Sequence, residues 1–290
     1  MIGPLDASDP RVINILQRKY LDPPSSNPYN LSTDVIYKVN KNGYTWPLIK
    51  FYTDILFANQ SGGFFVEAGA LDGEFLSNTL WLEQELNWTG LLVEPDLYNY
   101  RELLMKQRRA WASNSCLSST SYPKRTIMVS RSASGKRNKF EMAYNWIFRG
   151  QIHELKNNIS SSYDNFHARA SSIPLYSTVQ CFPLYSYLLA LNKTNIDLFT
   201  LDVQGAETGI IETIPFDKIK VKVFIIEHAT ETKYDRNFVQ FFDKQGYQLI
   251  ACAGEPDYVF VLRSEFSSYK FKTVTNYQKE GNWSFIYEKQ

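Results

Sequence analysis

From Gly63 onward, the chain alternates short apolar runs with longer segments in which apolar residues recur at helical spacing. Runs that are apolar throughout are typical of parallel strands, because helices cover such strands on both faces. The pattern therefore predicts an α/β fold built on a central sheet. The expected strands cover residues 64–67, 90–94, 112–117, 198–203, 221–227, 247–252 and 258–262, and the expected helices cover residues 78–86, 98–108, 207–214 and 236–244.

The last two expected strands are joined only by residues 253–257, which is too short for a crossover connection. These strands must therefore pair antiparallel. The prediction is a Rossmann-like sheet of seven strands that is mostly parallel and has an antiparallel last strand. This arrangement is typical of methyltransferases that use S-adenosylmethionine (SAM), and sheets that bind dinucleotides lack it.

The remaining segments are expected to surround this domain, which we place at residues 63–265. Residues 1–62 form an N-terminal helical appendage with two helices. The first covers residues 9–21, with Asp9 as its N-cap and Pro10 in its first turn, and the second covers residues 47–58. An irregular insert at residues 118–176 is expected to form a lid over the carboxyl ends of the strands, and residues 266–290 form an extension with a strand or two. The apolar face of the second helix is expected to contain Leu48, Phe51, Tyr52, Ile55 and Leu56.

A glycine-bearing turn follows the first expected strand and opens into a helix. Gly69 and Gly73 let the backbone approach a ligand closely, and the helix start offers unpaired N–H groups. The turn departs from the G-x-G-x-x-G pattern, and Glu67 and Asp72 would repel a pyrophosphate. An acidic turn suits a ligand with a cationic centre and a free amine, such as SAM. An ordinary strand–turn–helix is the alternative interpretation.

A second apolar run ends in Glu94, about 20 residues past Gly73, which is the spacing of an acid that binds a ribose. Near the end of the third strand, Ser115 and Cys116 could flank an adenine ring, although strand-end capping explains them equally well. Together these motifs give the cofactor-binding candidates Glu67, Gly69, Ala70, Asp72, Gly73, Asn78, Glu94, Pro95, Asp96, Ser115, Cys116 and Asp202.

Three residues near the ends of later strands are the catalytic candidates. Asp202 ends an apolar strand and therefore needs a partner or a ligand. Glu207 opens the following helix, where a carboxylate also favours the helix dipole. His228 could deprotonate a hydroxyl nucleophile, and a hydrogen-bonded histidine at the sheet rim is the equal alternative.

Composition limits the classes of partner that the protein can have, but it does not determine the cellular compartment. The net charge of +1 argues against a nucleic-acid partner, and the chain has no metal-ligand spacing and no apolar run of membrane-spanning length.

Three buried thiols are the favoured interpretation of the cysteines, and one disulfide with a free thiol is the alternative. The chain start lacks the features of a signal peptide, so a complete chain would be cytoplasmic and an excised domain could be luminal. The chain contains N-x-S/T sequons that favour a luminal domain. There are six, at Asn30, Asn59, Asn87, Asn158, Asn192 and Asn282.

The ordered motifs between Gly62 and Leu262 resemble the FkbM-type methyltransferase family: residues 64–78, 92–96, 195–197, 201–207 and 225–228. The resemblance implies a class I methyltransferase sheet, SAM as cofactor and methyl transfer to a hydroxyl. It places Glu67, Gly69, Asp72 and Gly73 in the SAM turn, Glu94 at the ribose and Asp202 at the methionine end. The family usually has an acid where this chain has Gln204, which puts activity in question.

Residues 9–11, 20–25, 28–31, 61–67 and 180–184 resemble the branch of animal proteins related to protein Star. That branch acts in the secretory pathway and helps to export growth-factor precursors. The resemblance leaves two hypotheses for function. The first is a SAM-dependent O-methyltransferase with a small-molecule or glycan acceptor. The second is a non-catalytic trafficking adaptor of the endoplasmic reticulum, Golgi or endosomes that binds a secretory protein cargo.

Overall fold

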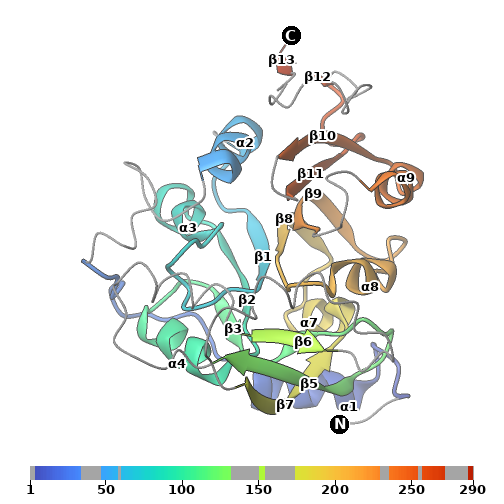
Figure 1. Cartoon of the computed structure of the whole chain (residues 1–290). Helices are drawn as coiled ribbons and strands as arrows, with labels where there is room; N and C mark the ends of the chain where they lie inside the picture. The colour runs from blue at the N-terminus through green and yellow to red at the C-terminus, as the bar shows by residue number, and fades with distance from the viewer. Residues whose placement is uncertain are drawn as a thin grey trace.

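A computed structural model describes residues 4–33, 47–57, 60–131, 150–153, 174–228, 235–253, 257–271 and 287–289. Its centre is a seven-stranded sheet in the order β10-β11-β9-β8-β1-β2-β3 (Figure 1). β1, β2, β3, β8 and β9 pair in parallel, and β11 pairs antiparallel with both β9 and β10. This confirms the predicted α/β class and the reversed last strand. The strands are β1 Phe64–Ala68, β2 Thr89–Val93, β3 Trp111–Ser113, β8 Asn195–Leu201, β9 Lys220–Glu227, β10 Tyr247–Ala253 and β11 Asp257–Leu262.

Alternate residues of each strand face two separate cores, because successive side chains point to opposite faces of a sheet. Phe64 and Val66 pack into one core, and Phe65 packs into the other. The first core is covered by α1 Pro10–Ile15, the π-helix η1 Leu16–Tyr20, α7 Leu184–Ala190, α8 Glu207–Glu212 and α9 Arg236–Lys244, and the second by α2 Pro47–Phe57, α3 Leu80–Leu86 and α4 Leu97–Met105.

The N-terminal helices are part of these cores. Val12 and Leu16 are fully buried in the first core, and the Asp9 side chain caps α1 as predicted by accepting from the Arg11 N–H. The predicted apolar face of α2 is partly wrong. Phe51 is 48% exposed, whereas Ile49 is buried. The buried stripe therefore lies rotated from the predicted one toward Ile49.

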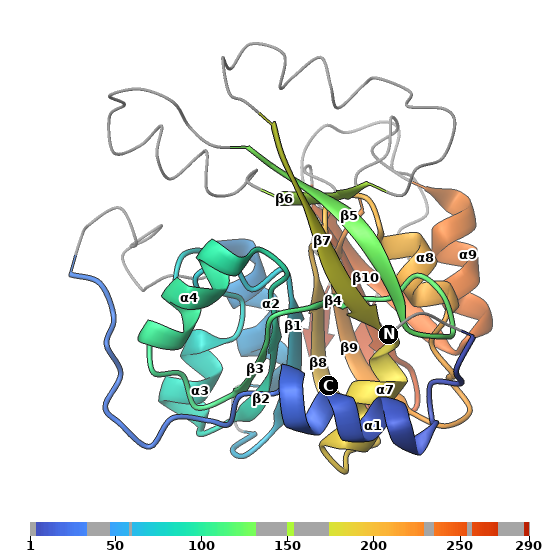
Figure 2. The ribbon, with the colours of Figure 1, turned by 90° about the horizontal axis from the view of Figure 1, so that it is seen from below.

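A second sheet, in the order β4-β7-β5-β6, corrects two predictions. The expected strand 112–117 is interrupted, because the Asn114 side chain donates to the carbonyls of Glu94 and Pro95 and turns the chain out of the central sheet. The expected irregular insert contains paired strands. The second sheet lies beneath the central one in Figure 1, on the side of the carboxyl ends of the parallel strands, and Figure 2 shows it from that side. Its strands are β4 Cys116–Leu117, β5 Lys124–Arg131, β6 Gly150–His153 and β7 Pro174–Phe182.

The C-terminal extension contains β12 Tyr269–Phe271 and β13 Tyr287–Lys289, which pair antiparallel as the predicted added strands. No helix in the described ranges combines the length and apolar character that crossing a bilayer requires.

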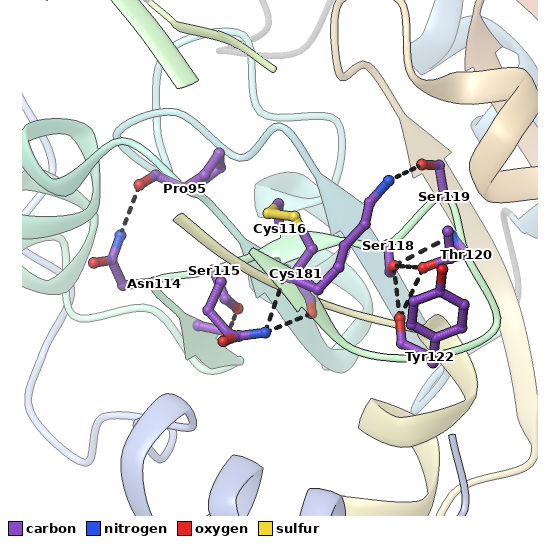
Figure 3. The surroundings of a disulfide bond; sticks show 12 residues. Pro95, Asn114, Ser115, Cys116, Ser118, Ser119, Thr120, Tyr122 and Cys181 are labelled. Carbon is purple, nitrogen blue, oxygen red and sulfur yellow. Dashed lines mark hydrogen bonds between the residues drawn. A yellow bond between two sulfur atoms is a disulfide. The ribbon is translucent and has the colours of Figure 1, made fainter. Parts of the chain in front are cut away.

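A disulfide joins Cys116 on β4 to Cys181 on β7 (Figure 3), and Cys252 is a buried free thiol. The favoured interpretation of three buried thiols is therefore wrong, and the alternative of one disulfide and one free thiol is confirmed. The two half-cystines are almost fully buried beside Met128 and Val179. The disulfide therefore cross-links β4 and β7, which are neighbouring strands of the second sheet.

Breaking this disulfide is expected to destabilise the fold. The cross-link spans 65 residues, and a loop of this size corresponds to about 4 kcal/mol of lost unfolded-chain entropy. Cys181→Ser should lower the free energy of unfolding by about 2–5 kcal/mol in urea titration. Dithiothreitol should destabilise the wild type similarly and leave Cys181→Ser unaffected. Equal midpoints for the oxidised and reduced wild type would contradict the assignment.

Candidate functional site

A cleft lies at the carboxyl ends of β1, β2 and β8. Glu67, Glu94 and Asp202 all contribute to its lining. Glu67 lies two residues past Phe65, and Glu94 lies two residues past Leu92, so both share the face of the second core. The cleft encloses about 920 Å³ including its open mouth. Its walls are Glu67, Ala68, Gly69, Ala70, Leu71, Phe75, Leu76, Asn78, Val93, Glu94, Pro95, Asn99, Cys116, Leu117, Asp202, Val203, Gln204 and Ile210.

The turn after β1 passes between its two neighbouring strands. The N–H groups of Gly69 and Ala70 donate to the carbonyl of Val93 at 3.0 and 3.2 Å. Gly69 has φ +84°, and a Cβ at this position would lie 1.8 Å from the backbone oxygen of Asp202. Only glycine fits here, because both the conformation and the space exclude a side chain. The turn therefore lies between the ends of β2 and β8, where Glu94 and Asp202 line the cleft.

Glu94 is buried at the end of β2 and accepts two backbone hydrogen bonds. Leu71 N–H donates to its Oε2 at 2.9 Å, and Asp96 N–H donates to its Oε1 at 2.8 Å. Burial raises the pKa of Glu94 to about 8. Two fixed oxygens in a cleft are suited to accept hydrogen bonds from a pair of neighbouring hydroxyls, such as those of a ribose.

Glu67 holds the segment after the turn. It accepts from the Ser77 hydroxyl at 3.0 Å, from the Asn78 N–H at 2.8 Å and from the Thr79 hydroxyl. Burial raises the pKa of Glu67, and the nearby Arg108 guanidinium opposes this shift. Glu67 therefore lines the cleft and also holds residues 77–79 in place by hydrogen bonds.

Arg108 is the centre of this wall, and the sequence analysis missed it. The residue is 3% exposed, and its side chain forms an ion pair with Glu83 at 2.8 Å and donates to the carbonyl of Gly73. It also donates to the hydroxyls of Ser77 and Thr79 at 3.1 and 3.0 Å. Arg108 thus ties the glycine turn and the start of α3 to the end of α4. In the sequence, nothing distinguishes Arg108 from the basic residues around it.

Four predicted cofactor residues do not line the cleft. Asp72 accepts from the N–H groups of Glu74 and Phe75, and Asp96 caps α4 by accepting from Tyr98 and Asn99. These are local turn and cap bonds. Gly73 has φ +75° and lies against Leu103. Ser115 turns inward and bonds with the hydroxyls of Ser113 and Tyr187.

Two predicted catalytic residues also lie away from the cleft lining. His228 follows Glu227 and therefore faces the first core, where it stacks on Phe238 at 4.1 Å and bonds to Asp235 at 3.2 Å. It is a hydrogen-bonded rim histidine. Glu207 accepts from the N–H groups of Val203 and Gly205, each at 3.0 Å, and burial raises its pKa to about 7. Glu207 therefore holds the loop that follows Asp202.

Asp202 has a partner that the sequence analysis did not select. Its carboxyl group is hydrogen-bonded to that of Glu227, and Gln204 Nε2 donates to Asp202 Oδ1 at 2.7 Å. Burial raises the pKa of both acids, and the charge of Asp202 raises that of Glu227 further. The pair therefore retains a proton near neutral pH. The signal was present in the sequence, because both acids directly end neighbouring strands of the sheet.

The charge of the cleft suits a cation that carries hydroxyls. Among the described residues that line it, three are carboxylic acids and none is lysine or arginine. Leu71, Leu76 and Gln204 also line it with positive φ values of 47°, 56° and 59°. Strained backbone of this kind concentrates at ligand sites.

The sheet order, the reversed β11 and the acidic cleft at the carboxyl ends define a Rossmann-like methyltransferase. The family model for the methyltransferase FkbM domain matches residues 67–249. The chain belongs to this family, whose cofactor is SAM. Glu94 and the Gly69 turn fit the ribose and the close backbone approach, and Glu67 and Asp202 fit the positive charge.

No curated protein matches the chain. Among solved structures, TrmK of M. capricolum in complex with its natural cofactor product S-adenosylhomocysteine (SAH) is similar at 11% identity. The match covers 75% of this chain and 67% of TrmK, with a TM-score of 0.33.

Acidification is expected to weaken SAM binding through Glu94. The ionised carboxylate accepts from two hydroxyls, whereas the neutral acid has one acceptor fewer. With the pKa near 8, the Kd should be about tenfold weaker at pH 7 than at pH 9. Glu94→Gln should remove this dependence, and an equal slope in both proteins would contradict the role of Glu94.

Without cofactor, the same group has the opposite effect on stability. The unfolded chain releases this proton near the ordinary value of 4.5, and the folded protein releases it near 8. The folded state therefore binds more protons in this window, and the stability that Glu94 contributes declines as the pH rises through it.

Proposed function

We propose that this protein transfers the methyl group of SAM to a hydroxyl oxygen of a small molecule or a glycan. The observation that supports this most is the buried Asp202–Glu227 pair, because Asp202 lines the cofactor cleft. When bound, SAM supplies an electrophilic methyl group on a sulfonium. The protein must then align the acceptor, exclude water and remove one proton.

Asp202 is the proposed proton acceptor. As the acceptor oxygen gains the methyl group, its proton passes to the Asp202 carboxylate. Glu227 and Gln204 orient that carboxylate by hydrogen bonds. Gln204 stands where the family usually has an acid, and its amide donates to Asp202 instead of adding a further negative charge. The acceptor is proposed to enter beneath the second sheet, which lies over the carboxyl ends of the strands (Figure 2).

Methyl transfer is the test of this role. With methyl-labelled SAM and a panel of hydroxyl-bearing glycans and small molecules, Asp202→Asn should lower kcat by about 100-fold or more. Glu227→Gln should alter the pH profile of kcat, because it removes one titrating partner. His228→Gln is the matched control and should keep kcat near the wild-type value. Full activity of Asp202→Asn, or loss of activity only in His228→Gln, would contradict the assignment.

A non-catalytic adaptor of the secretory pathway is the second proposal. The disulfide favours this proposal, because disulfides persist in oxidising compartments. The exposed sequons at Asn30, Asn87 and Asn192 favour it as well. An adaptor would still support export of a growth-factor precursor from cells when Gly69→Ala has weakened cofactor binding. If export stops with that variant, the binding-only function is contradicted.

A further inference from the structure

We propose that Asn87 and Asn192 are N-glycosylation sites, and that both glycans project from the end of the molecule opposite the cofactor cleft. Both residues begin N-x-T sequons and are solvent-exposed. Neither side-chain amide is hydrogen-bonded to another described residue, whereas the Asn30 amide donates to the carbonyl of Met105 at 3.1 Å. The proposal is independent of whether the chain transfers methyl groups.

The two asparagines occupy equivalent places in the fold. Asn87 caps the end of α3 with φ 54°, and Asn192 follows α7 with φ 53°. Each turn leads into the amino end of a parallel strand, β2 after Asn87 and β8 after Asn192. β2 and β8 both pair with β1. Because the cleft lies at the carboxyl ends of these same strands, glycans at the two turns leave it open.

The hydroxyl-bearing residues of both sequons are accessible as well. Thr89 and Thr194 are exposed. Their backbone groups hold the fold, with Thr89 N–H donating to Gly63 and Thr194 accepting from Lys220. A glycan could therefore be carried in the folded state without displacing a buried group.

The disulfide is the second observation that supports the proposal. N-glycans are added to secretory proteins, and disulfides such as Cys116–Cys181 form and persist in oxidising compartments of the same kind. The disulfide and the sequons therefore favour the same compartment. A chain that reaches the lumen should carry the disulfide and both glycans together.

The test uses the full chain, directed into the endoplasmic reticulum of cultured cells by a cleavable signal peptide. Peptide mapping after digestion with peptide-N-glycosidase F in heavy-oxygen water should show conversion of Asn87 and Asn192 to labelled aspartate. Thr89→Ala and Thr194→Ala should each remove one site, and Thr89→Ser and Thr194→Ser should keep them. These threonine variants leave Asn87 and Asn192 unchanged. Both asparagines have a left-handed backbone conformation, which another residue would adopt only with strain.

Two readouts decide the result. Occupied sites, an intact disulfide, and the same SAM Kd before and after deglycosylation are expected. Secreted protein with an intact disulfide but unmodified Asn87 and Asn192 would overturn the proposal. A SAM Kd that improves severalfold on deglycosylation would overturn the placement of the glycans away from the cleft.

Discussion

Gly69→Ala is expected to weaken SAM binding about 100-fold. The added methyl group would lie 1.8 Å from the backbone oxygen of Asp202, and alanine rarely adopts φ +84°. The ends of β1 and β8 must separate to relieve this overlap, and that movement opens the cleft between Glu94 and Asp202. A cost of about 3 kcal/mol corresponds to a Kd about 100-fold weaker, and titration calorimetry measures it.

Gly62→Ala is the control that distinguishes steric overlap of the added methyl group from strain of the backbone. Gly62 has φ +76°, and nothing lies within 4 Å of a Cβ built there. This variant should lose some stability and keep the wild-type Kd. If both alanine variants bind SAM equally well, the close contact between Gly69 and Asp202 does not shape the site.

Arg108→Met is expected to lower the free energy of unfolding by about 3–5 kcal/mol, because it leaves buried acids without their counter-charge. Glu83 would lose its ion pair, and Glu67 would lose the guanidinium that opposes its raised pKa. Urea denaturation followed by circular dichroism measures the effect. Arg108→Lys should recover only part of it, because an ammonium cannot reproduce the planar fork of hydrogen bonds.

Arg263→Met is the matched control for Arg108→Met. Arg263 also pairs with an acid, Asp243, but both side chains are about half exposed or more. Exposed pairs contribute little to stability, so the midpoint should not move measurably. Equal destabilisation by both variants would show that Arg108 does not organise the buried wall of the cleft.

Much of the site follows from the sequence because strand ends place side chains predictably. Glu67 and Glu94 end apolar runs, so the parallel sheet had to bring them to one edge. The prediction of His228 as a candidate base rested on its adjacency to Glu227 in the sequence. Glu227 and His228 are neighbours along the chain but face opposite sides of the sheet, and Glu227 is the one that meets Asp202.

Other features could not be predicted, because they depend on contacts distant in the sequence. Arg108 and Glu83 form an ion pair across 25 residues, and each looks like an ordinary surface residue. β5 is rich in basic and polar residues, so it lacks the apolar run that indicated the central strands. The pairing of Cys116 with Cys181 cannot be deduced from three cysteines alone.

The most direct test of the central claim is the titration of the full chain with SAM near pH 9, repeated with Glu94→Ala. The account predicts one site per chain, competition by SAH, and a Kd about 10–100-fold weaker in Glu94→Ala, because a charged hydrogen-bond acceptor contributes about 1.5–3 kcal/mol. Absence of binding heat from a chain shown to be folded, or an unchanged Kd in the variant, would contradict it.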